Sequence, residues 1–235
     1  MAVSALALAC VTSLASAAPA AQGGQGLSTD KDKTSYAIGM QIGTGINRSL
    51  ENVKGEVDVN VVLRAIGVVV RGEKPQMTIT EAQAQLETFG KRMQAKQAAQ
   101  AKAQGDKNLA EGTKFLTANA KKAGVKTTAS GLQYMVVTQG KGAKPKATDT
   151  VKVNYSGSLL DGTVFDASAK HGGPVEMQLD GVIPGWTEGV QLMPVGSKYV
   201  FWIPAKLAYG DKSSGPIGPN ATLKFEIELL SIAKK

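Results

Sequence analysis

Apolar residues recur at helical spacing in the first half of the chain and alternate with polar residues in the second half. Between residues 30 and 50 they have a helical spacing, at Tyr36, Met40, Ile42, Ile46 and Leu50. Residues 57–70 are rich enough in β-branched side chains for a strand, but Asp58 or Asn60 can cap a helix. We favour a helix there, because no strand-like run lies nearby to pair with it.

A long helix is predicted from Thr80 to about Lys122. This stretch is rich in Ala, Gln, Lys and Glu, contains no proline, and follows a break at residues 71–75. Thr80 with Gln83 predicts a capping box at its start, and Gly124 is the expected cap at its end. At ~1.5 Å per residue, some 40 residues would extend about 60 Å.

The middle of this helix is predicted to be a solvent-exposed stalk. No large apolar side chain occurs between Gln94 and Asn108, so this segment has nothing to bury in a core, and the residues that a coiled coil needs are missing. Gly105 and Gly112 each weaken a helix, and we expect the rod to bend there.

Beyond Gly124 the period of the pattern changes from 3.6 to 2, which is typical of strands. The strand candidates, separated by Gly, Pro and Asp turns, are residues 132–138, 151–155, 175–179, 198–203 and 223–229. One helical patch remains, at residues 186–192. Short strands with a single helix predict an α+β domain in which an antiparallel sheet is folded around that helix.

Composition divides the chain in the same way. The 235 residues carry a net charge of +8, and residues 30–126 hold 16 basic and 10 acidic side chains. Both Trp, four of five Tyr and three of five Phe lie beyond residue 126. The hydrophobic content of 43% excludes a wholly disordered chain. The basic residues are scattered among glutamines, so we expect no nucleic-acid partner.

Residues 1–21 have the pattern of a signal peptide. An apolar run leads to small residues around Ala17 and then to Pro19, and the run is too short to span a bilayer. Two alternatives remain open, a buried apolar N-terminal helix and lipidation at Cys10. Cleavage near Ala17 or Ala18 would remove the only cysteine and exclude disulfides.

The sequence lacks the motifs that several classes of enzyme chemistry require. There is no G-x-S-x-G motif, P-loop or dinucleotide glycine fingerprint. His171, the one histidine, cannot supply a metal cluster and is expected to be an exposed loop residue. Asp161 and Asp166 flank a turn, and turn capping explains Asp161. We therefore expect no metal and no cofactor.

Five motifs carry a family resemblance. DGTVFD (161–166), VIPGW (182–186), LMPVGS (192–197), IPAKLAYG (203–210) and GPNATLKFEIEL (218–229) occur in the order found in FKBP-type peptidyl-prolyl isomerases. The segment from about residue 130 to 235 resembles that family. With KDKTSYAIG (31–39) and the long helix, the whole chain is similar to the macrophage infectivity potentiator (Mip) group of bacterial FKBPs.

The resemblance implies a prolyl isomerase that binds a twisted X-Pro amide in an aromatic pocket. By motif match Asp166 and Tyr209 would be the catalytic residues, Asp166 near the amide carbonyl and Tyr209 hydrogen-bonded to the substrate backbone. Trp186 would form the pocket floor, and Val175 stands where the family often has an aromatic residue. The implied substrate-binding residues are Tyr155, Phe165, Val175, Val182, Ile183, Trp186, Ile217 and Phe225. Without the resemblance, ordinary core packing explains the same aromatics.

The resemblance also implies an organisation. We expect a signal peptide (1–21), a helical dimerisation domain (28–76), a long connecting helix (77–124) and an isomerase domain (125–235). It further implies a homodimer formed through residues 30–93. The expected substrates are proline-containing polypeptides, and the expected inhibitors are rapamycin-type macrolides. The expected location is the periplasm, the outer membrane or the cell surface. The alternative is a holdase chaperone or surface binding protein in which isomerisation is incidental.

Overall fold

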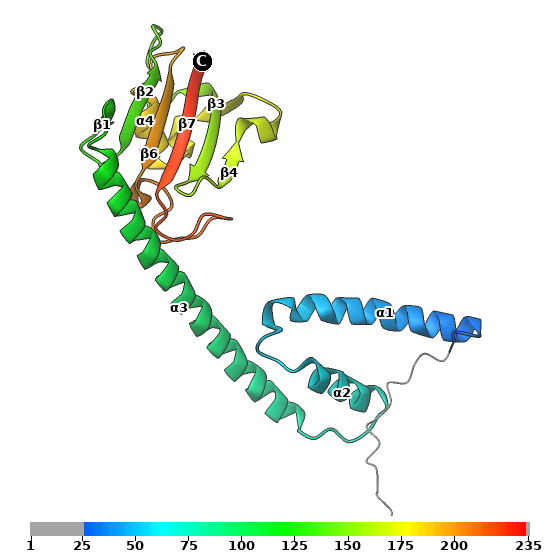
Figure 1. Ribbon diagram of the computed structural model, residues 1–235. Helices are drawn as coiled ribbons and strands as arrows, with labels where there is room; N and C mark the ends of the chain where they lie inside the picture. The colour runs from blue at the N-terminus through cyan, green and yellow to red at the C-terminus, as the bar shows by residue number, and fades with distance from the viewer. Residues whose placement is uncertain (1–25, 234–235) are drawn as a thin grey trace, which may run out of the picture. The chain divides into compact units, whose positions relative to one another are not determined.

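The computed structural model describes residues 26–233 (Figure 1). The predicted signal peptide and Cys10 lie outside these residues. The chain divides into two compact units, one ending at Thr78 and the other beginning at Ile79. Among residues 26–233 no helix combines the length and the apolar character needed to cross a membrane.

The first unit contains two helices, α1 (Asp30–Leu50) and α2 (Val59–Val70), joined through a short 3-10 turn, η1 (Glu51–Val53). Both helices were predicted. Asp58 caps α2 as expected, accepting a hydrogen bond from the Asn60 N–H at 2.8 Å. Thr29 and Asp32 form a capping box at the start of α1 that the sequence analysis missed. Neither helix contains a buried residue, so residues 26–233 leave all of their apolar side chains at least partly exposed.

The second unit begins with α3 (Ile79–Asn119). Because the helix starts at Ile79, Thr80 lies inside it, and the predicted capping box at Thr80 is wrong. The helix ends three residues before the predicted end. Gly124 does not cap it but adopts a positive φ of 81° in the turn that follows.

Gly105 and Gly112, which were expected to be bending points, are contact points of α3. Both are buried. A Cβ on Gly105 would lie 3.3 Å from the Pro219 Cβ, and one on Gly112 would collide with the Thr222 side chain. Residues 94–104 are exposed, as expected of a stalk. From Gly105 onward the helix packs on the rest of its unit.

Within the described residues the second unit forms one antiparallel sheet in the order β1-β2-β6-β7-β3-β4, with β5 also paired to β3. The strands are β1 (Val125–Thr127), β2 (Gln133–Thr138), β3 (Thr150–Leu159), β4 (Val164–Ala167), β5 (Val175–Gln178), β6 (Lys198–Ile203) and β7 (Leu223–Ile232). Strands β1 and β4, of three and four residues, were not predicted.

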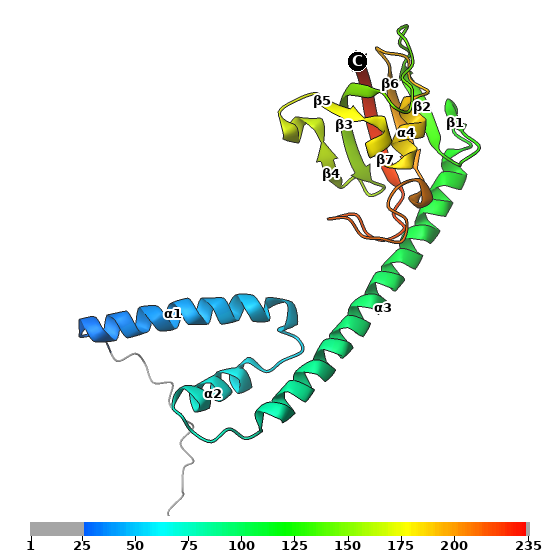
Figure 2. The same cartoon turned by 180° about the vertical axis from the view of Figure 1, so that it is seen from behind.

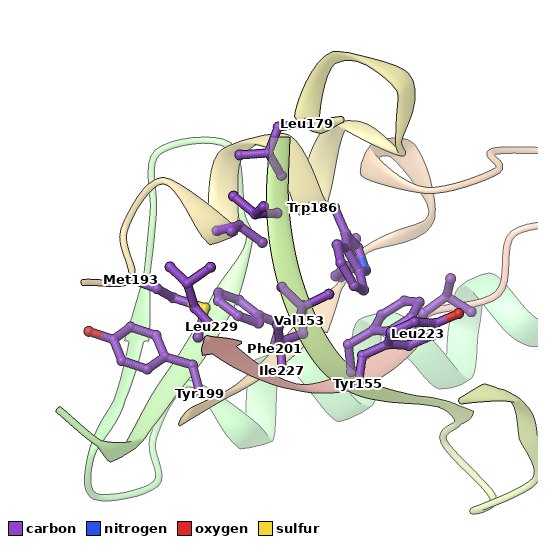
Figure 3. Packing of buried hydrophobic residues seen from close by; sticks show 14 of the residues in the cluster. Val153, Tyr155, Leu179, Trp186, Met193, Tyr199, Phe201, Leu223, Ile227 and Leu229 are labelled. Atoms are coloured by element: carbon purple, nitrogen blue, oxygen red, sulfur yellow. The ribbon is translucent and has the colours of Figure 1, made fainter. Parts of the chain in front are cut away.

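Helix α4 (Pro184–Val190) crosses one face of the sheet, as Figure 2 shows. Two of its glycines make close packing possible: a Cβ on Gly185 would collide with Ile203, and one on Gly189 would lie 2.7 Å from the Phe201 ring. Side chains of α4, β3, β6 and β7 meet in the core (Figure 3). The predicted α+β architecture is confirmed.

Candidate functional site

A cavity of about 590 Å³ opens beside α4, where β3, β4 and β7 meet the loop between β6 and β7. Nine of the ten predicted site residues line it: Tyr155, Phe165, Asp166, Val182, Ile183, Trp186, Tyr209, Ile217 and Phe225. They come from segments up to 70 positions apart, and the sheet register brings them together. The tenth, Val175, is half-buried on β5 and packs against the core without lining the cavity.

Aromatic rings form the base of the cavity. The Trp186 side chain, 3% exposed, meets Tyr155 and Phe225 edge to face, each pair of ring centroids being 5.3 Å apart. Phe165 meets Phe225 in the same way at 5.5 Å. Gly157 leaves the room for the two phenylalanine rings, since a Cβ there would lie 2.6 Å from Phe225 and 2.7 Å from Phe165. Edge-to-face contacts fix the orientation of the rings, so the base is rigid and apolar.

The Asp166 carboxylate lies at the rim of this base and accepts three hydrogen bonds. The Tyr155 hydroxyl donates to Oδ2 at 2.6 Å, and the Ala167 N–H donates to Oδ1 at 2.9 Å. The His171 Nε2 lies 3.0 Å from Oδ1. Donors on three sides hold the carboxylate in one orientation.

These contacts set the charge states of Asp166 and Tyr155. The Tyr155 hydrogen bond, followed by that of His171, holds the pKa of Asp166 below its usual value. Burial, together with the Asp166 carboxylate, raises the pKa of the Tyr155 hydroxyl well above its usual value. At neutral pH the site therefore contains a carboxylate and a neutral phenol that donates to it.

The opposite wall comes from the loop between β6 and β7. Tyr209 is 39% exposed, so its hydroxyl can reach a bound molecule, whereas Ile217 is 4% exposed and packs toward the core. Ser214 and Ile217 exchange backbone hydrogen bonds of 2.9 and 3.0 Å. The loop thus presents one polar and one apolar side chain to the cavity.

Some lining residues were missed by the sequence analysis. Met177 stands two positions from Val175 on β5 and therefore shares its face, so strand alternation could have identified it. No sequence signal marks the others, Gly181, Ser214, Gly215 and Pro216. His171 is exposed, as predicted, but its contact with Asp166 was not anticipated.

The arrangement suits binding rather than bond cleavage. It offers an apolar base for a compact hydrophobic ring, a fixed carboxylate and a phenolic hydroxyl at the rim. Within residues 26–233 no group of three or more His, Cys, Asp or Glu side chains could hold a metal ion.

Comparison with known protein families gives two matches. Residues 141–230 match the model of the FKBP-type peptidyl-prolyl cis-trans isomerases. Residues 31–136 match the model of the domain amino terminal to such isomerases. Together the two models cover most of the described residues.

Individual relatives match along most of their own length. The chain is 46% identical over 207 residues to an FKBP-type peptidyl-prolyl cis-trans isomerase, FkpA, of Aeromonas hydrophila, covering 87% of this chain and 77% of that one. It is 45% identical over 223 residues to outer membrane protein MIP of Legionella longbeachae, covering 93% of each. The crystal structure of FkpA from Escherichia coli superposes with a TM-score of 0.73 at 36% identity, covering 88% of this chain and 98% of that one.

Proposed function

The chain belongs to the FKBP-type peptidyl-prolyl cis-trans isomerases, and from this premise we propose that it catalyses X-Pro rotation in the cavity over Trp186, with Asp166 and Tyr209 as catalytic residues. The isomerase reaction itself follows from the family. The observation that carries the assignment of the site is the Tyr155–Asp166 hydrogen-bonded pair beside an apolar aromatic base.

The barrier that the site has to lower is electronic. Rotation about a peptide bond costs about 18–20 kcal/mol because amide resonance is lost on the way. The planar amide carries more charge on its oxygen than the twisted one, so water stabilises the ground state more than the transition state. An apolar cavity reverses this preference and lowers the barrier by differential binding.

The aromatic base holds the proline ring. Trp186 is fixed edge to face by Tyr155 and Phe225, so its indole needs no rearrangement on binding. Val182 and Ile183 at the start of α4 complete the wall, and the Ile183 backbone N–H would donate to a substrate carbonyl. With the ring held, rotation is confined to the residue that precedes proline.

Asp166 and Tyr209 act on the amide from the rim. The fixed negative charge of Asp166 orients the amide carbonyl and disfavours charge on its oxygen, which the planar form has and the twisted form loses. The Tyr209 hydroxyl donates a hydrogen bond to the substrate backbone and keeps the chain in register. Neither residue forms a covalent bond, and the step requires no cofactor.

A proline-peptide assay tests this assignment. In the mature protein, Asp166→Ala combined with Tyr209→Phe should lower kcat/KM by about 100-fold, because two transition-state contacts are lost. The matched control is Tyr134→Phe, which removes the hydroxyl of a tyrosine on β2 that does not line the cavity. Wild-type kinetics in the double variant would show that the site lies elsewhere.

The first unit serves dimerisation in this proposal. Its helices have no buried residue, yet Met40 is 60% exposed and Ile42 56% on α1, and Leu63 is 53% and Val69 66% on α2. Helices with uncovered apolar faces need a partner to be stable. A second copy of the chain, paired through α1, α2 and the start of α3 (residues 30–93), would cover them.

The finer assignments follow from the same relationships. Substrates would be proline-containing segments of folding polypeptides, and rapamycin-type macrolides would compete for the cavity. Val175, packed outside the lining, leaves the pocket wider than an aromatic residue would. The N-terminal pattern and the naming of one relative as an outer membrane protein support a location in the periplasm or at the outer membrane. The holdase alternative is not favoured by the family relationship.

A further inference from the structure

Helix α3 is in contact with the loop that forms one wall of the site. The Asn108 side-chain amide donates a hydrogen bond to the Pro219 carbonyl at 2.8 Å, across 111 positions of sequence. The Gln104 side-chain amide donates to the side-chain oxygen Oδ1 of Asn108 at 2.7 Å, which leaves the Asn108 NH₂ group directed at the loop. The helix therefore supplies a hydrogen-bond donor at a defined position beside the loop.

The glycines of α3 allow this approach. Gly105 is buried against Pro219 and Asn220, and Gly112 against Thr222. At Gly105 a Cβ would lie 3.2 Å from the Asn220 side-chain nitrogen, so even alanine would require Pro219 and Asn220 to shift by a few tenths of an ångström. These close contacts explain why both positions lack a side chain in a helix whose sequence otherwise favours strong helix formers.

The contacted residues connect directly to the site. Asn220, in the left-handed conformation with φ of 53°, donates its N–H to the Gly210 carbonyl at 2.7 Å. Gly210 follows Tyr209, the proposed catalytic residue, and Ile217 of the cavity wall stands two positions before Pro219. Both stems of the loop are thus fixed by the pair Pro219–Asn220, which rests on α3.

A second feature connects the two surfaces. A groove of about 290 Å³ runs between α3 and the loop, with Gln104 and Asn108 on one side and Pro216 and Gly218 on the other. Pro216 also lines the candidate site. A movement of the loop relative to the helix would therefore change the shape of both.

We propose that α3 is a working part of the isomerase site, with Asn108 as a positioning residue that holds the Tyr209–Asn220 loop in its substrate-binding conformation. The inference rests on the proposed function, because it acts through Tyr209 and Ile217. Its ligand is the same proline-containing polypeptide, and its effect is on binding, since the loop holds substrate whereas Asp166 belongs to β4.

Two variants of the full-length mature protein test the proposal. Asn108→Asp keeps the side-chain volume but removes the donor to Pro219. Gly105→Ala adds one methyl group at the contact. Each has a control on the exposed part of the same helix: Gln97→Glu makes the same change of charge, and Gly90→Ala adds a methyl group with nothing within 4 Å.

We expect Asn108→Asp and Gly105→Ala to raise KM for a proline tetrapeptide about three- to tenfold, since misplaced binding groups weaken substrate positioning. Faster amide hydrogen exchange in residues 209–222 should accompany the change, and the pH profile set by Asp166 should not move. Thermal melting identifies a variant that is merely unfolded, and kinetics are then taken below its transition. Both controls should match wild type.

Unchanged KM and unchanged exchange in both variants would overturn the proposal, as would equal effects in the controls. Failure of the proposed function looks different. In that case Asp166→Ala with Tyr209→Phe would leave activity intact, whatever Asn108 does.

Discussion

The Tyr155 hydroxyl oxygen lies 2.6 Å from Oδ2 of Asp166, and this pair stands at the junction between the aromatic base and the polar rim of the site. The Tyr155 ring packs edge to face on Trp186 while its oxygen donates to the carboxylate. One side chain therefore contributes to the apolar surface and keeps the neighbouring charge in place. Several consequences of this arrangement can be measured.

Tyr155→Phe should keep the ring and remove the donor. Asp166 then loses the hydrogen bond that contributes most to its lowered pKa, so its pKa rises and the acid limb of the kcat/KM profile moves to higher pH. At neutral pH kcat/KM should fall about three- to tenfold, the effect of one hydrogen bond to a partly exposed charge.

Tyr199→Phe provides the matched control for this change. The Tyr199 hydroxyl donates to Gln139 at 2.9 Å and does not line the cavity. Its removal should leave both kcat/KM and the pH profile as in wild type. An acid limb that stays in place in Tyr155→Phe would contradict the role given to the pair.

His171→Ala should also raise the pKa of Asp166, but by less than Tyr155→Phe does. The hydrogen bond of His171 is the weaker of the two side-chain causes of the lowered Asp166 pKa. The ionised carboxylate is favoured by folding, so it stabilises the protein above the usual Asp pKa of 3.8, and this stability is lost as pH falls through the lowered value. Urea unfolding between pH 2 and 6 should show a smaller loss in His171→Ala, complete at a higher pH than in wild type, because the folded-state pKa of Asp166 then lies closer to 3.8. Curves that superpose on wild type would contradict it.

Phe225→Leu should separate a site role from a core role. Phe225 and Phe201 are register partners on β7 and β6, but only Phe225 lines the cavity. Both substitutions should cost about 1–2 kcal/mol of unfolding free energy, since each removes buried volume. We expect kcat/KM and macrolide affinity to fall about tenfold in Phe225→Leu, where a wall of the pocket is lost. Phe201→Leu should retain the activity of its folded fraction, and equal losses in both would assign Phe225 to the core alone.

The paired substitution Met40→Lys with Leu63→Lys should convert a dimer into a monomer, because one charge would be placed among the exposed apolar side chains of each helix. Light scattering measures the change in mass. Activity on a proline tetrapeptide should remain as in wild type, since neither residue lines the cavity. Ala65→Lys, at another exposed position on α2, is the control for added charge. A wild-type protein that is already monomeric would refute the dimer.

The sequence alone predicted the elements that have a strong local pattern. Helix α1 was recognisable from its helical spacing, and strands β3 and β7 from the strict alternation of apolar and polar residues at 151–155 and 223–229. The motifs around Asp166, Trp186 and Tyr209 also marked the parts of the chain that meet at the cavity. Such features depend on neighbours in sequence, and local physics is sufficient to specify them.

Tertiary structure decided the features that depend on distant residues. Gly105 and Gly112 look like helix-weakening positions until Pro219 and Thr222 are placed against them. The sequence does not show whether a glycine bends a helix or makes room for a neighbouring segment, because the contacting residues here lie more than 100 positions away.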